Sequence, residues 1–235
     1  MIKNIFAAAM LVVSGTASAG LVTHEFNNGD DLSAWQRDRT VPNGFEIVNN
    51  ELVMTIEGDD APNVNGVFYD THGMKLDIGQ STFLSIDMYV EQDWNFNDIY
   101  NRYAGIWAVG YDSSDAIVNY AILEYQDGGF SAYDSGFDSP NGGWPENDLA
   151  FNIGLNTLSF GLNGSGVDYY LNGALVYSET TSGTTYFGDV ILNAKNESHD
   201  FQVTYDNLTY GTVPEPGMLA LFGLGALLLL RRKRV

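Results

Sequence analysis

The chain contains no cysteine among its 235 residues. No disulfide can therefore hold the fold together, no thiol can act as a nucleophile, and no thiolate can bind a metal ion. Histidine is scarce as well, because His24, His72 and His199 form no His-x-His or His-x-x-x-His metal motif. The sequence also lacks a Gly-x-Ser-x-Gly nucleophile elbow. We therefore expect the histidines to be structural.

Basic residues are few outside the two ends of the chain. Lys3 and the cluster at 231–234 account for half of the 10 Lys and Arg residues, so residues 20–213 hold 5 basic side chains against 29 acidic ones. Such a surface repels nucleic acid and anionic lipid and attracts divalent cations. We expect no nucleic-acid partner.

A sustained 3.6-residue apolar period is missing between residues 20 and 213, and alternating apolar residues recur instead, as at Leu84, Ile86 and Met88. Asn172-Gly173 suits a two-residue hairpin turn, since both residues tolerate a positive φ. These patterns predict an all-β fold, a two-sheet antiparallel jelly-roll sandwich. The expected strands are 21–26, 44–48, 51–56, 64–69, 81–90, 103–110, 116–124, 128–133, 156–163, 169–171, 174–177, 187–194 and 200–210, and the expected long loops are 57–65, 91–102 and 134–149.

The N-terminal segment predicts export. Lys3 precedes a short apolar stretch, and Ala17 and Ala19 form an A-x-A cleavage site before Gly20. A secretory signal peptide at 1–19 implies passage through the Sec translocon and cleavage by signal peptidase. The expected organisation is then a signal helix at 1–19, a β-sandwich at 20–212 and a separate tail at 213–235.

The tail has three parts in a fixed order. Pro214 and Pro216 prevent a helix from running back into the domain, an apolar helix follows at 217–230, and four basic residues end the segment at 231–234. Thirteen apolar residues make only about 20 Å of helix, whereas the hydrocarbon core of a membrane is about 30 Å thick. Transient membrane insertion followed by cleavage fits this length, and an uncut tail anchor is the alternative. The basic cluster should stay cytoplasmic, which leaves the domain outside.

This tail resembles the PEP-CTERM sorting tail of Gram-negative bacteria. The resemblance implies that an exosortase recognises and processes the chain, which passes from an inner-membrane-tethered precursor to the cell surface or extracellular matrix. It also implies an association with exopolysaccharide. The residues that carry the sorting signal are Val213, Pro214, Glu215, Pro216, Arg231 and Arg232.

A second resemblance concerns the folded part. Segments 25–35, 45–52, 156–173 and 205–208 resemble parts of concanavalin-A-like and carbohydrate-binding jelly-roll domains. Family-16 glucanases of this kind carry a Glu-x-Asp-x-x-Glu strand, and the nearest string here starts at Glu91 but has Phe96 in place of the second glutamate. The two-carboxylate mechanism therefore cannot be carried over. Glu124 and Asp127 are expected to be solvated surface acids, and no catalytic residue is assigned.

Two kinds of binding site remain open. Exposed aromatic rings stack on sugars while polar neighbours bind the hydroxyl groups, and the best glycan-binding candidates are Trp94, Tyr100, Arg102, Tyr103 and Trp144. Trp107, Tyr120 and Phe160 fall in strand patterns and are expected in the core. If the jelly-roll resemblance holds, a structural calcium ion joins the first and last strands through Glu25, Asp30 and Asp206, with Asp59 and Asp60, or Asp138 and Asp148, as other candidates.

The lack of a recognisable catalytic constellation favours a non-enzymatic exported protein that associates with glycan or exopolysaccharide. A secreted glycosidase or polysaccharide lyase is one alternative, and a calcium-dependent adhesion or self-assembly module is another. The expected partners are the Sec translocon, signal peptidase, an exosortase and extracellular polysaccharide.

Overall fold

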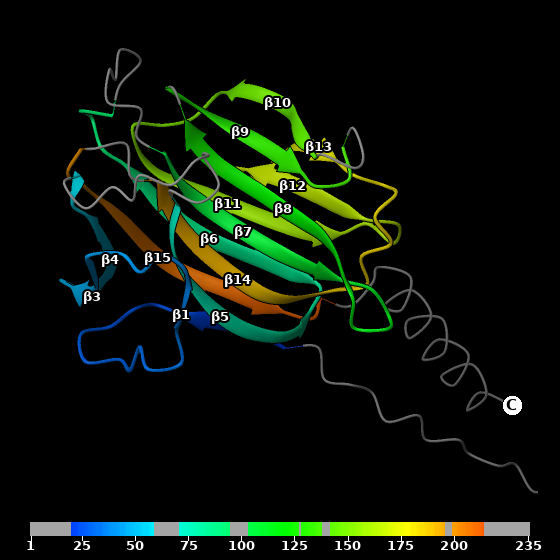
Figure 1. Ribbon diagram of the computed structural model, residues 1–235, viewed down its shortest axis with the longest axis horizontal. Coiled ribbons are helices and arrows are strands. Elements are labelled where there is room, and N and C mark those ends of the chain that lie inside the picture. Colours follow the sequence, from blue (N-terminus) through cyan, green and yellow to red (C-terminus); the bar gives the residue numbers. More distant parts are fainter. Residues whose placement is uncertain are drawn as a thin grey trace, which may run out of the picture.

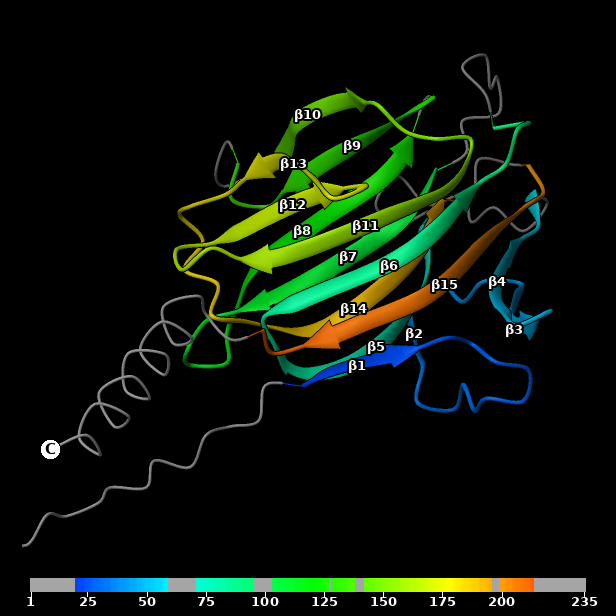
Figure 2. The same cartoon turned by 180° about the vertical axis from the view of Figure 1, so that it is seen from behind.

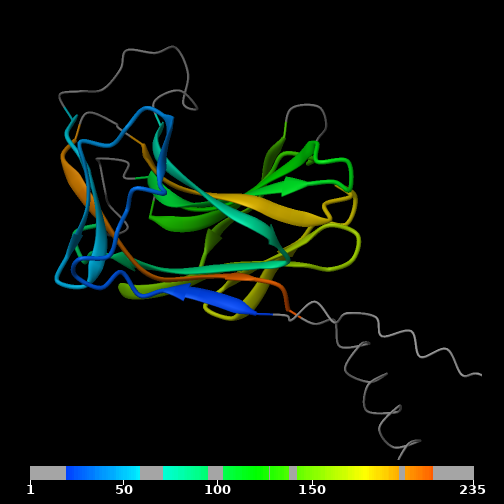
Figure 3. The same cartoon turned by 90° about the horizontal axis from the view of Figure 1, so that it is seen from below.

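The computed structural model describes residues 20–58, 71–94, 103–126, 128–137, 142–195 and 199–213. In these ranges the regular structure consists of β-strands arranged in two antiparallel sheets. The sheets stack as two layers, which are visible edge-on in Figure 3. The predicted all-β sandwich is confirmed.

The eight-stranded sheet lies toward the viewer in Figure 2. Its β15 is paired along one side with β6, and along the other side first with β4 and then with β1. In spatial order the strands are β13 (Ala174–Ser178), β12 (Val167–Leu171), β11 (Gly154–Leu162), β6 (Phe83–Val90), β15 (Phe201–Gly211), β4 (Glu51–Ile56) and β3 (Gly44–Val48), with β1 (Leu21–His24) beside the end of β15.

The seven-stranded sheet covers the other side of the core (Figure 1). Its spatial order is β10 (Gly143–Leu149), β9 (Gly129–Asp134), β8 (Ile117–Gln126), β7 (Tyr103–Tyr111), β14 (Tyr186–Lys195), β5 (Thr71–Ser81) and β2 (Gln36–Arg39). The central strands β7, β8 and β14 are buried along most of their length. Strands that are covered on both faces read as continuous apolar runs, as these do.

Apolar side chains at alternating positions of the strands fill the space between the two sheets. In β6, Leu84, Ile86, Met88 and Val90 all point inward and are fully buried, as their period of two predicts. The predicted hairpin is also present, because Asn172 and Gly173 have φ values of 53° and 77° and join β12 to β13. A positive φ at both positions is what this two-residue turn requires.

One buried side chain ties the two layers together. Tyr205 of β15 reaches across the core, and its hydroxyl group donates hydrogen bonds to the carbonyl oxygens of Gly105 at 3.0 Å and Asn193 at 3.1 Å. These two acceptors are cross-strand partners in β7 and β14. A single hydroxyl of the eight-stranded sheet therefore fixes two central strands of the other sheet.

Several segments differ from the sequence prediction. The predicted loop at 134–149 contains β10, which pairs with β9 at Gly143, Glu146 and Leu149 with register shifts between these pairs. Strand β2 and most of β5 were not predicted. Strand β2 contains no apolar residue, so no alternation could reveal it. In β5, Met74, Leu76 and Ile78 do alternate with polar residues, and the prediction missed this signal. The predicted strand at 64–69, the signal helix and the tail helix lie outside the described residues. Within the described ranges, no helix has the length and apolar character needed to cross a membrane.

The inter-sheet tie gives the first prediction. Tyr205→Phe removes the side-chain donor that the carbonyl groups of Gly105 and Asn193 share, so the free energy of unfolding should fall by about 1–3 kcal/mol. Chemical denaturation measures this loss. Tyr89→Phe, at a tyrosine of β6 that is 39% exposed, is the matched control and should change stability little. Equal stability of the two variants would contradict the role of the tie.

Candidate functional site

The outer face of the seven-stranded sheet carries a second apolar cluster, separate from the core. Trp107 and Val109 of β7, Ile122 of β8 and Ile191 of β14 are all nearly buried there, although they point away from the other sheet. The rings packed against them are those of Tyr111, Tyr120, Tyr133 and Trp144. A solvent-facing side of a sheet is normally polar, so this apolar cluster makes the outer face a candidate site.

A hollow of about 240 Å³ opens on this cluster. Strands β5, β7, β8, β9, β10 and β14 all contribute to it, so the sheet itself forms its floor. We call it the aromatic hollow, and its lining residues are Thr71, Trp107, Tyr120, Ile122, Glu124, Tyr133, Trp144 and Lys195. Apolar walls with a few convergent polar groups are characteristic of small-molecule and saccharide sites.

Glu124 is the carboxylate of the aromatic hollow. It lies in β8 opposite Gly105 of β7, is 8% exposed, and its Oε2 accepts a hydrogen bond of 2.7 Å from the Asn193 amide. Burial raises the pKa of Glu124 to about 7, and hydrogen bonds from Asn193 and Trp107 and the charges of Lys195 and Arg39 offset this only in part. A carboxyl group with this pKa can both give and take a proton near neutral pH.

A glycine makes this geometry possible. Gly105 lies between Asn193 and Glu124 in the row that crosses the strands. A Cβ atom there would stand 2.1 Å from the carbonyl oxygen of Leu123 and 2.7 Å from the Cα of Glu124. Only glycine allows the two backbones to approach this closely. The Asn193 side chain can then pass over β7 and reach Glu124.

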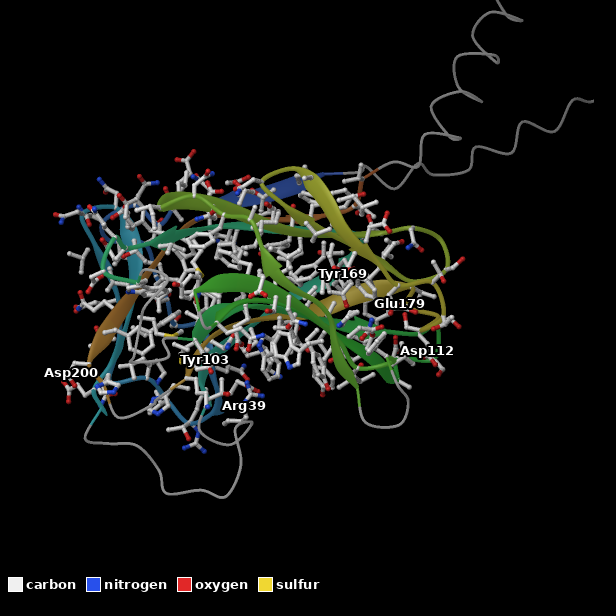
Figure 4. All side chains as sticks on the ribbon, turned by 90° about the horizontal axis from the view of Figure 1, so that it is seen from above. Arg39, Tyr103, Asp112, Tyr169, Glu179 and Asp200 are labelled. Carbon is white, nitrogen blue, oxygen red and sulfur yellow. The ribbon has the colours of Figure 1, made fainter. Side chains whose placement is uncertain are left out.

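Two cations approach the aromatic hollow. The Arg39 guanidinium lies 4.1 Å from the Trp107 ring centroid and 2.7 Å from the Asp38 carboxylate. Lys195 is 7% exposed, and its Nζ lies 4.8 Å from the Tyr103 ring centroid. Figure 4 shows Arg39 and Tyr103 on the same side of the sandwich. Both cations lie over aromatic faces, which favours them electrostatically.

The structure sorts the glycan-binding candidates. The prediction that Trp94 binds glycan is wrong, because this side chain is only 1% exposed and packs in the core against Tyr125 and Phe201. Trp144 lines the aromatic hollow with its ring centroid 5.2 Å from that of Tyr133, and Tyr103 lies at the adjacent start of β7. Tyr100 and Arg102 lie outside the described residues.

Other residues depart from their predicted places. Phe160 is in the core as expected, but Trp107 and Tyr120 belong to the outer cluster. Glu124 is a buried acid and not a solvated one. Both errors have one cause: β7 and β8 are covered on both faces, so the alternation of apolar residues does not reveal which face holds the core. Glu91 follows β6 in the other sheet and is exposed.

The predicted calcium trio is not assembled. Burial, Asp87 and Glu25 raise the pKa of Asp206, so Glu25 and Asp206 do lie near each other. Asp30 instead accepts a hydrogen bond of 2.8 Å from the backbone N–H of Asn27 and closes its own turn. Within the described ranges, no group of three or more His, Asp or Glu residues is arranged to hold a metal ion.

Comparison with known proteins confirms the sorting tail. Residues 212–234 match the PEP-CTERM protein-sorting motif. The motif marks the chain as an exported protein that an exosortase processes at the membrane. Val213 is the last described residue, and the other five predicted sorting residues, like Ala17 and Ala19, lie outside the described ranges. No curated protein matches the chain in sequence.

Solved structures match the folded part. The β-glucanase of Bacillus licheniformis superposes with a TM-score of 0.56 at 14% identity, covering 84% of this chain and 100% of that one. The laminarinase catalytic domain of Thermotoga maritima gives 0.62 at 12% identity, covering 84% and 99%. An endo-β-galactosidase of Clostridium perfringens gives 0.57 at 12% identity, covering 83% and 63%. At this identity the likeness establishes the jelly-roll fold.

These matches overturn the expectation of a non-enzymatic protein. The three solved structures named above are a β-glucanase, a laminarinase and an endo-β-galactosidase, all of them enzymes. The sequence argument relied on the missing second glutamate near Glu91, but the described part of that string, residues 91–94, follows β6 of the other sheet and contributes no lining residue to the aromatic hollow. Among the described residues that line the hollow, the acid with a raised pKa is Glu124, which no motif identified.

The buried acid predicts a pH dependence of stability. Because the pKa of Glu124 rises from 4.5 to about 7 on folding, the unfolded chain ionises first, and stability falls as the pH rises through this interval. Glu124→Gln removes the penalty, so relative to its stability at about pH 4 the variant should gain up to about 3 kcal/mol over wild type by about pH 8. Thermal melting across pH tests this, with Glu91→Gln as the control. A pH-independent difference would contradict it.

Proposed function

We propose that this exported protein is a carbohydrate-active enzyme that binds a saccharide in the aromatic hollow and cleaves its glycosidic linkages, with Glu124 as the general acid/base. The observation that carries the proposal is a buried carboxyl group with a pKa near 7 at the bottom of a hollow walled by aromatic rings. Perturbed acids in hollows of this kind concentrate at functional sites.

The walls suit a sugar ring. Trp144 and Tyr133 stand edge to face with ring centroids 5.2 Å apart, while Trp107 and Tyr120 are 6.3 Å apart. Flat apolar faces accept the C–H side of a pyranose, and Thr71 and Lys195 offer polar contacts to its hydroxyl groups. The likeness to glucanases and an endo-galactosidase supports a glycan as the ligand.

The sorting tail supports the setting. We propose a route through the Sec translocon and signal peptidase to an inner-membrane-tethered precursor in a Gram-negative bacterium, followed by exosortase processing and delivery to the cell surface or extracellular matrix. Extracellular polysaccharide is then the natural substrate. The matched motif at 212–234 is the observation behind this route.

A polysaccharide screen tests the activity. Wild type should generate new chain ends from at least one polysaccharide, and Glu124→Gln should lower kcat by about 10²–10⁴-fold while binding persists, because the amide keeps the shape but cannot transfer the proton. Glu91→Gln, at an exposed glutamate of the other sheet, should retain full activity. Equal activity in all three proteins would remove Glu124 from the mechanism.

Trp144→Ala tests the binding wall separately. Loss of the indole should weaken saccharide binding by about 3- to 10-fold, in line with about 0.5–1.5 kcal/mol for an aromatic contact. Isothermal titration with the catalytically inert Glu124→Gln background measures it. Phe137→Ala, at a ring that is 42% exposed outside the lining of the hollow, is the control. A loss of affinity in both variants would speak against a specific wall.

Calcium remains a proposal supported by one observation. Burial raises the pKa of Asp206 and the charges of Asp87 and Glu25 raise it further, and a divalent cation between Glu25 and Asp206 would relieve their repulsion. Calcium should then raise the melting temperature and a chelator should lower it by several degrees. A melting temperature that is independent of calcium would remove the proposal.

A further inference from the structure

Most of the basic side chains of the folded domain lie at or near the aromatic hollow. Residues 20–213 contain only five basic side chains. Arg39 lies over Trp107, Lys195 lines the hollow, and Lys75 lies across β14 from Trp107, level with Ile191. Three of the five cations therefore belong to one face of one sheet. The few cations of the folded domain are therefore concentrated on this face.

Arg39 has two energetically unfavourable features, a positive φ and a buried guanidinium group. It ends the edge strand β2 with a φ of 55°, which is unfavourable for an arginine. Burial lowers the pKa of its guanidinium, although Asp38 and Glu124 act in the opposite direction. Strained backbone and a buried cation persist where the surrounding structure uses them. The position turns the guanidinium toward the hollow and away from bulk water.

The negative groups around these cations are identifiable. Asp38 pairs with Arg39 at 2.7 Å and Asp189 pairs with Lys75 at 3.6 Å. Among the described residues that line the hollow, Glu124 is the one carboxylate, and it stays partly protonated near neutral pH. Hydrolysis of a glycosidic bond by the usual route needs two carboxylates that face each other. The hollow therefore offers one acid/base and two cations, Arg39 and Lys195.

We propose that the substrate is an acidic polysaccharide built from uronic acids, that Arg39 and Lys195 bind the uronate carboxylate, and that Glu124 cleaves the chain by β-elimination. The proposal rests on the proposed function and names its substrate class and reaction. Guanidinium and ammonium groups bind carboxylates through short charge-assisted hydrogen bonds. By neutralising the carboxylate they also make the adjacent C–H group more acidic.

The elimination needs no other reactant. The Glu124 carboxylate takes the proton from the carbon next to the uronate carboxyl group. The electron pair of that C–H bond forms a C=C bond to the neighbouring carbon, whose C–O glycosidic bond breaks with its pair passing to oxygen. Glu124 then returns the proton to that oxygen. No water is consumed, and the new non-reducing end carries an unsaturated uronate that absorbs in the ultraviolet.

The test uses the full chain with polygalacturonate, polymannuronate, the same polymers with their carboxyl groups reduced to hydroxymethyl groups, and neutral β-glucans. Ultraviolet absorbance reports elimination, and reducing ends report any cleavage. We expect unsaturated product from a polyuronate and none from its carboxyl-reduced form. Arg39→Gln and Lys195→Gln should each raise KM by about 10- to 100-fold, whereas Arg37→Gln, at an exposed arginine of the same edge strand, should not.

The outcomes separate the two proposals. Reducing ends from a neutral glucan without unsaturated product would overturn the elimination and leave the proposed function intact. Cleavage of polyuronate that is indifferent to both Arg39→Gln and Lys195→Gln would overturn the role of the cations. Circular dichroism of each variant shows that it is folded, and the Lys195 variant serves if Arg39→Gln is not. Absence of cleavage and binding with every polymer would overturn the proposed function itself.

Discussion

The hydroxyl group of Tyr205 in the core is linked by hydrogen bonds to Glu124 in the aromatic hollow. Tyr205 donates to the carbonyl oxygens of Gly105 and Asn193 from below, and the Asn193 side chain donates to Glu124 from above. The same pair of residues thus connects the core to the aromatic hollow. Tyr205, Asn193 and Glu124 therefore form one hydrogen-bonded chain that runs from β15 through the core to the aromatic hollow.

The residues that form the aromatic hollow keep water away from the Glu124 carboxyl group. Glu124 is buried among the residues that line the hollow, which distinguishes it from the exposed acids of the chain. Burial raises its pKa, and the nearby Arg39 and Lys195 keep the charged form accessible near neutral pH. The aromatic rings therefore have two physical effects: they offer apolar surface, and they set the proton affinity of the group that they surround.

Sequence patterns predicted the fold better than the site, for a definite reason. Period-two alternation in β6 and the Asn172-Gly173 turn are local signals, and both are present as expected. The site depends on pairs far apart in the chain, such as Asn193 and Glu124, which become neighbours only through the strand order. In β8 both faces are covered, so its aromatic residues could not be assigned to the core or to the outside. Trp94 shows the reverse error, since a residue in a polar stretch was buried by tertiary packing.

The two ends of the folded domain leave it side by side. Leu21 lies opposite Gly211 in the register of β1 and β15, and the sorting motif begins at residue 212. This end of the sandwich is the Tyr111 end of β7. Phe187 of β14 pairs with Gly110 of β7 on one side and with Ser81 of β5 on the other. Thr82, which follows Ser81, donates its backbone N–H to the carbonyl oxygen of Gly211. Gly105, next to Glu124, is about 20 Å further along that strand. Cutting the tail after Val213 removes none of the described strands and none of the described lining residues, so processing leaves the described hollow unchanged.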